Sequence, residues 1–128
     1  MERMGMPGEE RDAFLSDVRA LLIADRARTA ARILALDKDF TAIVEDAQLT
    51  ATDDEHDPDG TTSAFERSQA SALLASAVEH LSDVDSALSK IDDGTYGRCE
   101  RCGAEINQER LLARPAARTC ITCASRPA

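Results

Sequence analysis

Aromatic side chains are scarce in this chain of 128 residues, which has no Trp, one Tyr and three Phe. Ala, Leu, Ile and Val must therefore supply the core, and a large globular interior is not expected. Such a composition suits helix-on-helix packing better than a β-sandwich or a barrel.

Long apolar runs are missing as well. The longest strongly apolar stretch, Ala20–Ala24, is far too short to span a membrane. Residues 1–12 are polar and charged, unlike a signal peptide. We therefore expect a cytoplasmic protein with reduced thiols and no membrane partner.

Basic charge is too sparse for a typical DNA-binding surface. Residues 94–128 carry six Arg and three Glu, a charge of +3, so residues 1–93 must carry −12 of the total of −9. Proteins that bind duplex DNA usually present a basic face to the phosphates. The sequence therefore predicts no direct sequence-specific DNA binding, and its acidic part suits a basic protein surface.

Apolar residues recur at helical spacing along residues 9–48, which contain no Pro or Gly. From Ile33 onward the spacing alternates between three and four residues, as in a coiled-coil seam. The seam consists of Leu15, Val18, Leu22, Ile33, Leu36, Phe40, Ile43 and Ala47. Between Leu22 and Ile33 it is thin, and Ala27 and Ala30 are expected to carry it. The pattern predicts one long helix.

An acidic turn with the sequence TATDDEHDPDGTT interrupts this pattern at residues 50–62. Asp-Pro followed by Asp-Gly is strong turn chemistry. Ser63 and Glu66 then form a capping box, so a second helix is expected from Ser63 to Asp93, with Gly94 at its C′ position. Its seam is Leu74, Ala77, Leu81, Val84, Leu88 and Ile91.

Two helices with one seam each predict an antiparallel coiled-coil hairpin over residues 9–93, with an acidic tip at 50–62 and a flexible N-terminus at 1–8. The first helix is the longer one. Its start, around Phe14, Leu15 and Val18, should therefore pack against the Cys-containing tail.

The tail, residues 94–128, carries four cysteines in the pattern C-x₂-C-x₁₇-C-x₂-C, namely Cys99, Cys102, Cys120 and Cys123. This spacing is typical of a four-Cys zinc site, in which each pair grips one edge of a tetrahedral ion. Four thiolates leave no open coordination position, so the sequence predicts one structural Zn²⁺. Between the pairs, Ile106, Leu111 and Leu112 predict a short helix that Pro115 ends.

Other uses of four cysteines remain as alternatives. Two disulfides would require an oxidising compartment, a thioredoxin-type redox pair would require a βαβ context, and an iron–sulfur cluster also uses four Cys. The paired spacing and the absence of an export signal favour zinc.

A longer motif surrounds these cysteines. It consists of Gly94-Thr-Tyr96-Gly97-Arg-Cys99-Glu-Arg-Cys102-Gly103, Ile106, Arg110-Leu111, Ala113, Pro115, Cys120 and Cys123. These residues resemble the DksA/TraR C4-type zinc-finger family of bacterial RNA polymerase-binding regulators. The resemblance implies an all-α protein in which a two-helix coiled-coil hairpin precedes a small C-terminal zinc-ribbon module.

The resemblance also implies a partner and working residues. Family members bind RNA polymerase with the zinc module at the rim of the secondary channel and the acidic tip toward the active centre, and some act with guanosine tetraphosphate. The tip would present Asp53, Asp54, Asp57 and Asp59, and the polymerase rim would meet Arg98, Arg101, Arg110, Arg114 and Arg118. Best-known members carry Asp-x-x-Asp-x-Ala at the tip. In one register Asp54 and Asp57 match its two Asp, with Asp59 in place of Ala. In the other, Asp57-Pro58 aligns with the family's Asp-Pro, and Gly60 and Thr62 stand in place of Asp and Ala.

No Ser/His/Asp, Cys/His or phosphate-loop constellation occurs, so we expect a regulator rather than an enzyme. The alternative function is a zinc-stabilised coiled-coil oligomerisation or adaptor protein with another partner. Since each helix has one seam and the hairpin uses both, the sequence favours a monomer.

Overall fold

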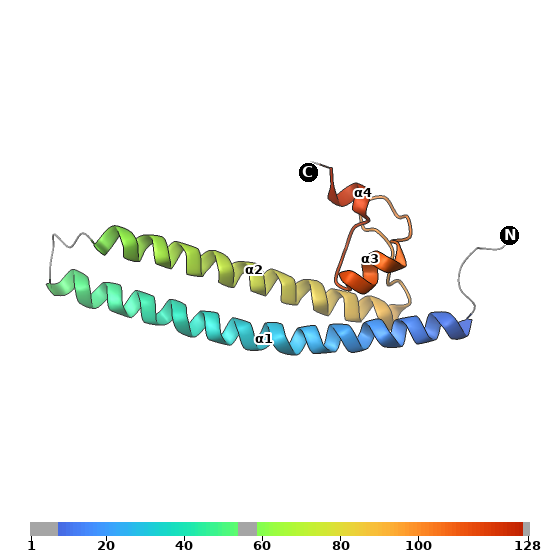
Figure 1. Cartoon of the computed structure of the whole chain (residues 1–128), viewed down its shortest axis with the longest axis horizontal. Helices are drawn as coiled ribbons and strands as arrows, with labels where there is room; N and C mark the ends of the chain where they lie inside the picture. The colour runs from blue at the N-terminus through green and yellow to red at the C-terminus, as the bar shows by residue number, and fades with distance from the viewer. Residues whose placement is uncertain (1–7, 54–58, 127–128) are drawn as a thin grey trace. The chain divides into compact units, whose positions relative to one another are not determined.

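The computed structural model describes residues 8–53 and 59–126. Within these ranges the chain forms α1 (Gly8–Asp53), α2 (Asp59–Asp93), α3 (Gln108–Ala113) and α4 (Ile121–Ala124) (Figure 1). The described residues include no strand, only an isolated β-bridge between Arg98 and Glu105. The predicted all-α class is confirmed. None of the helices in the described ranges combines the length and the apolar character that a membrane crossing requires.

The two long helices extend further into the acidic turn than the sequence suggested. α1 continues to Asp53 and α2 begins at Asp59, so Ser63 lies inside α2 rather than at its start. Residues 9–57 contain neither Gly nor Pro. Each added residue therefore gains a backbone hydrogen bond and nothing ends α1 earlier.

The C-terminus of α2 is closed as predicted. Gly94 adopts a left-handed conformation with φ of 81°, which costs Gly little. The N–H of the next residue, Thr95, donates to the carbonyl of Lys90 at 2.9 Å. This is the hydrogen bond of a Schellman motif, and it turns the chain out of the helix toward the cysteines.

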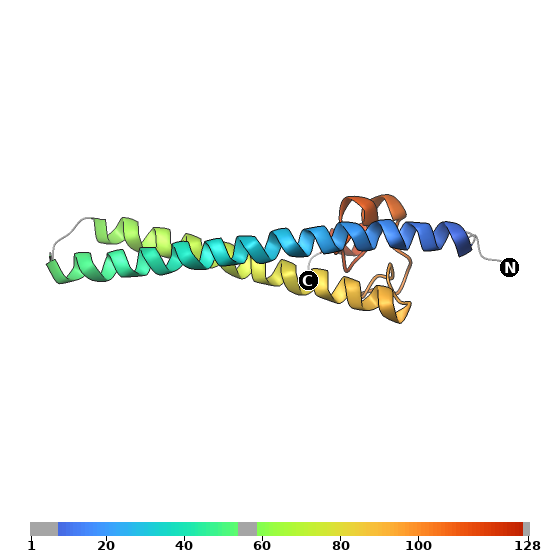
Figure 2. The same ribbon diagram turned by 90° about the horizontal axis from the view of Figure 1, so that it is seen from below.

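The described chain divides into two compact units, one formed by residues 8–27 with 82–126 and the other by residues 28–53 with 59–81. In the second unit, α1 and α2 run antiparallel beside each other (Figures 1 and 2). The seam residues of this unit are partly or wholly buried: Ile33, Leu36, Phe40, Ile43, Leu74, Ala77 and Leu81. The predicted seam is confirmed at these positions, whereas the side chain of Ala47 lies outside the described residues. Ala70, which is 8% exposed, extends the seam by one step.

The thin part of the first seam was assigned to Ala27 and Ala30, and this is wrong for Ala27, while Ala30 is partly buried. Ala27 is exposed, whereas Thr29 is buried with 6% of its surface exposed. Ala27 follows Leu22 by five residues, which places it about 140° away around the helix. A polar residue, which an apolar pattern search passes over, continues the buried face instead.

The core of the first unit joins the start of α1, the end of α2 and the tail. Val18, Leu22 and Val84 are fully buried in one cluster with Tyr96, Ile106 and Leu111. Phe14 and Leu15 pack against this cluster. The expectation that the start of the first helix packs against the tail is confirmed. Burying each aliphatic side chain of this kind stabilises the fold by about 1.5–3 kcal/mol.

Candidate metal centre

The first cysteine pair lies in a tight turn that the β-bridge between Arg98 and Glu105 closes. The N–H of Cys99 donates to the carbonyl of Ala104 at 2.8 Å, and the N–H of Gly103 donates back to the carbonyl of Cys99 at 3.0 Å. Gly103 has a φ of 78°, a conformation that residues with a Cβ rarely adopt. The turn thus depends on the glycine that directly follows Cys102.

The second pair is held by a helix start. Cys120 is the N-cap of α4, and its sulfur accepts a hydrogen bond from the N–H of Cys123 at 3.4 Å. A cysteine sulfur therefore occupies the place of the usual capping oxygen. This arrangement turns both side chains of the pair toward the same point.

All four sulfurs lie within 4.8 Å of one another. The sulfurs of Cys102 and Cys120 are 3.9 Å apart. A regular tetrahedron with Zn–S bonds of about 2.3 Å places its sulfurs about 3.8 Å apart. The same separation is nearly twice a disulfide bond of about 2.05 Å, and all four cysteines are free. The residues therefore fit one structural zinc ion, which fills its coordination sphere with four thiolates.

The thiols differ in acidity. Burial by itself would raise the pKa of Cys99, but backbone N–H groups, with that of Cys102 contributing most, lower the pKa to about 6. Burial and the neighbouring sulfurs raise the pKa of Cys123 to about 12. Four crowded thiols cannot all ionise unless a cation balances their charge, and a coordinating metal ion supplies that charge.

Tyr96 anchors the module to the core. The residue is 5% exposed, and its hydroxyl donates to the carbonyl of Pro115 at 2.8 Å. Burial raises the pKa of this hydroxyl to about 12. The hydrogen bond therefore ties the segment before Cys99 to the segment before Cys120.

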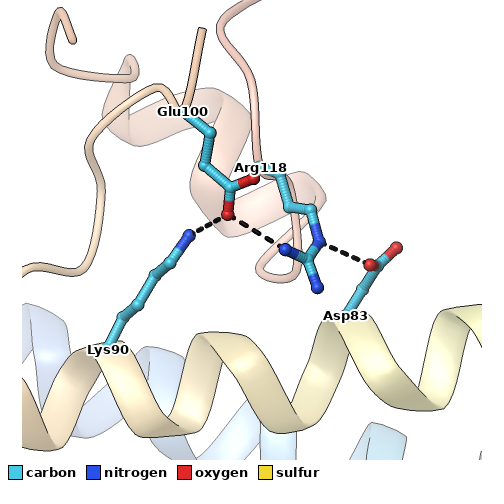
Figure 3. Close-up of polar contacts among 4 residues, drawn as sticks. All are labelled: Asp83, Lys90, Glu100 and Arg118. Carbon is cyan, nitrogen blue, oxygen red and sulfur yellow. Dashed lines mark hydrogen bonds and ion pairs between the residues drawn. The ribbon is translucent and has the colours of Figure 1, made fainter.

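Four charged side chains connect the module to α2 in a chain of ion pairs (Figure 3). Asp83 and Lys90 belong to α2, whereas Glu100 and Arg118 flank the cysteines. Arg118 donates to Asp83 at 2.6 Å and to Glu100 at 3.0 Å, and Lys90 pairs with the same Glu100 oxygen. Lys90, followed by Arg118, lowers the pKa of Glu100. Sequence reasoning missed this network because its members are up to 35 positions apart.

Most of the arginines predicted to contact a partner are engaged within the chain. Arg98, Arg101 and Arg110 donate to the carbonyls of Gly103, Cys123 and Thr119, respectively, each at 3.0 Å. Arg118 belongs to the ion-pair network, and Arg114 is exposed. The first role of four of the five is therefore to hold the cysteine loops in shape.

The predicted tip residues are only partly described. Asp53 is the last residue of α1 and Asp59 is the first residue of α2. Asp54 and Asp57 lie outside the described residues. Because α1 and α2 run antiparallel, the last residue of α1 and the first residue of α2 lie at the same end of the hairpin.

Comparison with known proteins agrees with this site. The family described as "Prokaryotic dksA/traR C4-type zinc finger" matches residues 94–127. An uncharacterized protein of Aquifex aeolicus is 57% identical over 44 residues, which cover 34% of this chain and 30% of that protein. The RNA polymerase-binding transcription factor DksA of Escherichia coli is 48% identical over 40 residues, covering 31% of this chain and 26% of DksA. The chain thus spans less than a third of the length of these two relatives.

A solved structure extends the likeness beyond the zinc module. Transcription factor DksA2 from Pseudomonas aeruginosa superimposes with a TM-score of 0.69 at 27% sequence identity, covering 89% of this chain and 82% of DksA2. The shared part therefore includes the helical hairpin as well as the cysteines. Residues 94–127 therefore match the C4-type zinc finger of the DksA/TraR family, and the fold of the chain is similar to that of DksA2.

Proposed function

We propose that the chain is a non-enzymatic transcription regulator that binds RNA polymerase at the secondary channel. The zinc module would sit at the rim of the channel, and the acidic end of the hairpin would point toward the active centre. The proposal implies action in the cytoplasm, where the polymerase works.

The observation that carries the proposal is the combination of one zinc module with one long hairpin. The combined arrangement is that of DksA2, over 82% of its chain. A zinc module alone would support many functions, because fold and function are only loosely linked. A relative that shares the zinc module is an RNA polymerase-binding transcription factor, which supports the same partner for this chain.

Charge supports an insertion role for the hairpin. Residues 37–66 carry ten acidic side chains and a single basic one, Lys38. This concentration around the turn repels nucleic acid backbones and attracts cationic protein surfaces or bound metal ions. We propose that Asp53, Asp54, Asp57 and Asp59 modulate the polymerase after binding.

The arginines contribute differently from one another under this proposal. Arg98, Arg101, Arg110 and Arg118 would act on polymerase mainly by shaping the module, because their guanidinium groups bond to carbonyls or carboxylates of this chain. Arg114 is exposed and is the first choice for a direct contact. Guanosine tetraphosphate stays a proposed effector with no assigned residue.

The decisive experiment is binding of the zinc-loaded protein to core RNA polymerase, measured with and without a competing secondary-channel factor. We expect saturable binding that the competitor displaces, since both proteins would occupy one channel. Binding that the competitor leaves unchanged would contradict the proposed location. No binding at micromolar concentrations would contradict the proposed partner.

The tip is tested separately from binding. The double variant Asp54→Asn, Asp57→Asn should bind polymerase normally and lose its effect on transcription in vitro. The matched control is Asp37→Asn with Asp39→Asn, which removes the same charge from exposed positions of α1. Equal transcription effects of both double variants would show that only net charge matters and would refute a specific role of the tip.

Oligomeric state separates this proposal from the adaptor alternative. The apolar residues flanking the seams, Ile23, Leu34 and Leu73, are 53%, 73% and 43% exposed. We propose a monomer, because these positions form no second continuous seam for a partner helix. Small-angle scattering of the zinc-loaded protein would show a dimer mass if the adaptor alternative holds.

A further inference from the structure

The four-residue network Asp83–Arg118–Glu100–Lys90, here called the ionic circuit, connects three segments of the first unit (Figure 3). Asp83 and Lys90 lie seven positions apart on α2, which is two helical turns or about 10 Å. Glu100 and Arg118 come from two different loops of the zinc module. The links to Asp83 and Lys90 therefore join the zinc module to α2.

Both module residues of the ionic circuit are next to zinc ligands. Glu100 lies between Cys99 and Cys102, and Arg118 precedes Cys120 by two positions. The N–H of Glu100 also donates to the carbonyl of Arg118 at 2.9 Å. The two cysteine loops thus meet at the same place where the ionic circuit meets α2.

Closing the circuit is more favourable when the two loops are held together. Without the ion, the seventeen residues between Cys102 and Cys120 gain conformational freedom, and closing the circuit then costs loop entropy. With the ion bound, the four metal–sulfur bonds already hold the two loops together, so the ion pairs form without this entropy loss. Isolated surface ion pairs contribute little, whereas pairs between preorganised, half-buried partners contribute more.

We propose that the ionic circuit couples zinc binding to the attachment of the zinc module to α2. Asp83 acts on the zinc site through its ion pair with Arg118 and is therefore a positioning residue. Coupling of this kind is reciprocal: whatever zinc adds to the attachment on α2, the attachment adds to zinc affinity. This inference goes beyond the proposed function and does not depend on the identity of the partner.

The test is the zinc affinity of the full chain, measured by competition for Zn²⁺ with a chromophoric chelator. Asp83→Asn removes the negative charge that pairs with Arg118 while keeping the shape of the side chain. We expect zinc binding to weaken by about threefold to tenfold, the effect of one or two ion pairs. The difference from the unsubstituted protein should shrink in high salt, because ions screen these partly exposed charges.

Asp85→Asn is the matched control. Asp85 lies two positions further along α2 and pairs with Arg26 of α1 at 2.6 Å, on the hairpin rather than on the module. The control should leave zinc affinity unchanged. Equal zinc affinities of the Asp83→Asn and Asp85→Asn proteins would overturn the proposal.

A charge-exchange variant distinguishes the loss of the ion pair from a general folding defect. Arg118→Asp alone places three carboxylates together and should weaken zinc binding more than Asp83→Asn does. Adding Asp83→Arg to it should recover part of the loss, because an opposite-charge pair is restored. No recovery would mean that Arg118 acts without Asp83 and would overturn the coupling.

Amide hydrogen exchange gives a readout independent of the metal competition. In zinc-loaded protein, the Glu100 amide should exchange faster in Asp83→Asn than in Asp85→Asn, since its acceptor is the carbonyl of Arg118. Identical exchange rates at this amide in the two variants would also refute the proposal.

Discussion

Leu22→Ala tests the packing of the first unit most directly, because three consecutive apolar residues of α1 have very different environments. Leu22 is fully buried, whereas its neighbours Leu21 and Ile23 are 43% and 53% exposed. Leu22 belongs to the cluster that also contains Tyr96 and Leu111 of the tail. Its truncation should therefore loosen both the hairpin and the zinc module.

The expected loss of unfolding free energy follows from this burial. Removing a fully buried Leu side chain loses the transfer free energy and leaves a cavity, about 2–5 kcal/mol in total. Ile23→Ala should cost less than about 1 kcal/mol, because half of the side chain is already in water and Ala is the better helix former. Leu34→Ala, at a position 73% exposed, should stay within about 0.5 kcal/mol.

The assay is urea unfolding followed by circular dichroism at saturating zinc, with tail amide exchange as a second probe. Zinc must be in excess in every sample, since ligand binding shifts apparent stability. A loss below about 0.5 kcal/mol for Leu22→Ala, or a loss equal to that of Ile23→Ala, would refute the packing of α1 described above.

Three further predictions concern the tail. Chelating the metal, or substituting Cys102→Ser, should unfold the tail while α1 and α2 keep much of their helicity; a tail that keeps its protected amides without metal would contradict a structural zinc ion. Ultraviolet titration of Tyr96 should give a pKa near 12 in the folded protein. Because the folded form holds this proton more tightly than the unfolded form, the free energy of unfolding should fall as the pH rises from about 10 to 12. An ordinary pKa near 10 would place the ring in water. Gly103→Ala should lower the free energy of unfolding by about 1–2 kcal/mol, because Ala must adopt the positive φ of this position. No steric clash adds to this loss, since no neighbouring atom lies within 4 Å of the added Cβ. An unchanged unfolding midpoint would show that the turn relaxes.

The helices and their buried faces could largely be predicted from the sequence. Spacing of three and four residues is a local property that survives folding, so Ile33, Leu36 and Phe40 on α1 and Leu74 and Ala77 on α2 were assigned correctly to the seam. The four-cysteine site could also be predicted from the sequence, because two Cys-x₂-Cys pairs are typical of a zinc site.

The errors fall where one local signal competed with another. The capping box at Ser63 predicted a helix start, but α2 begins four residues earlier at Asp59. Backbone hydrogen bonds gained by extending the helix outweighed a single side-chain cap. Thr29 was missed because a polar residue can occupy a buried seam position when its hydroxyl is satisfied, which composition alone does not reveal.

The sequence by itself determined the helical periods, the helix-ending glycine and the two cysteine pairs, because each of these depends on residues within a few positions of one another. Only the tertiary structure decided that Arg118 and Glu100 meet Asp83 and Lys90 on α2, and that Tyr96 closes on Pro115. These contacts join residues separated by up to 35 positions, and a charge or hydroxyl has no preferred partner until the folded backbone brings one within bonding distance. The local pattern therefore specifies the parts, while long-range packing selects which polar groups connect them.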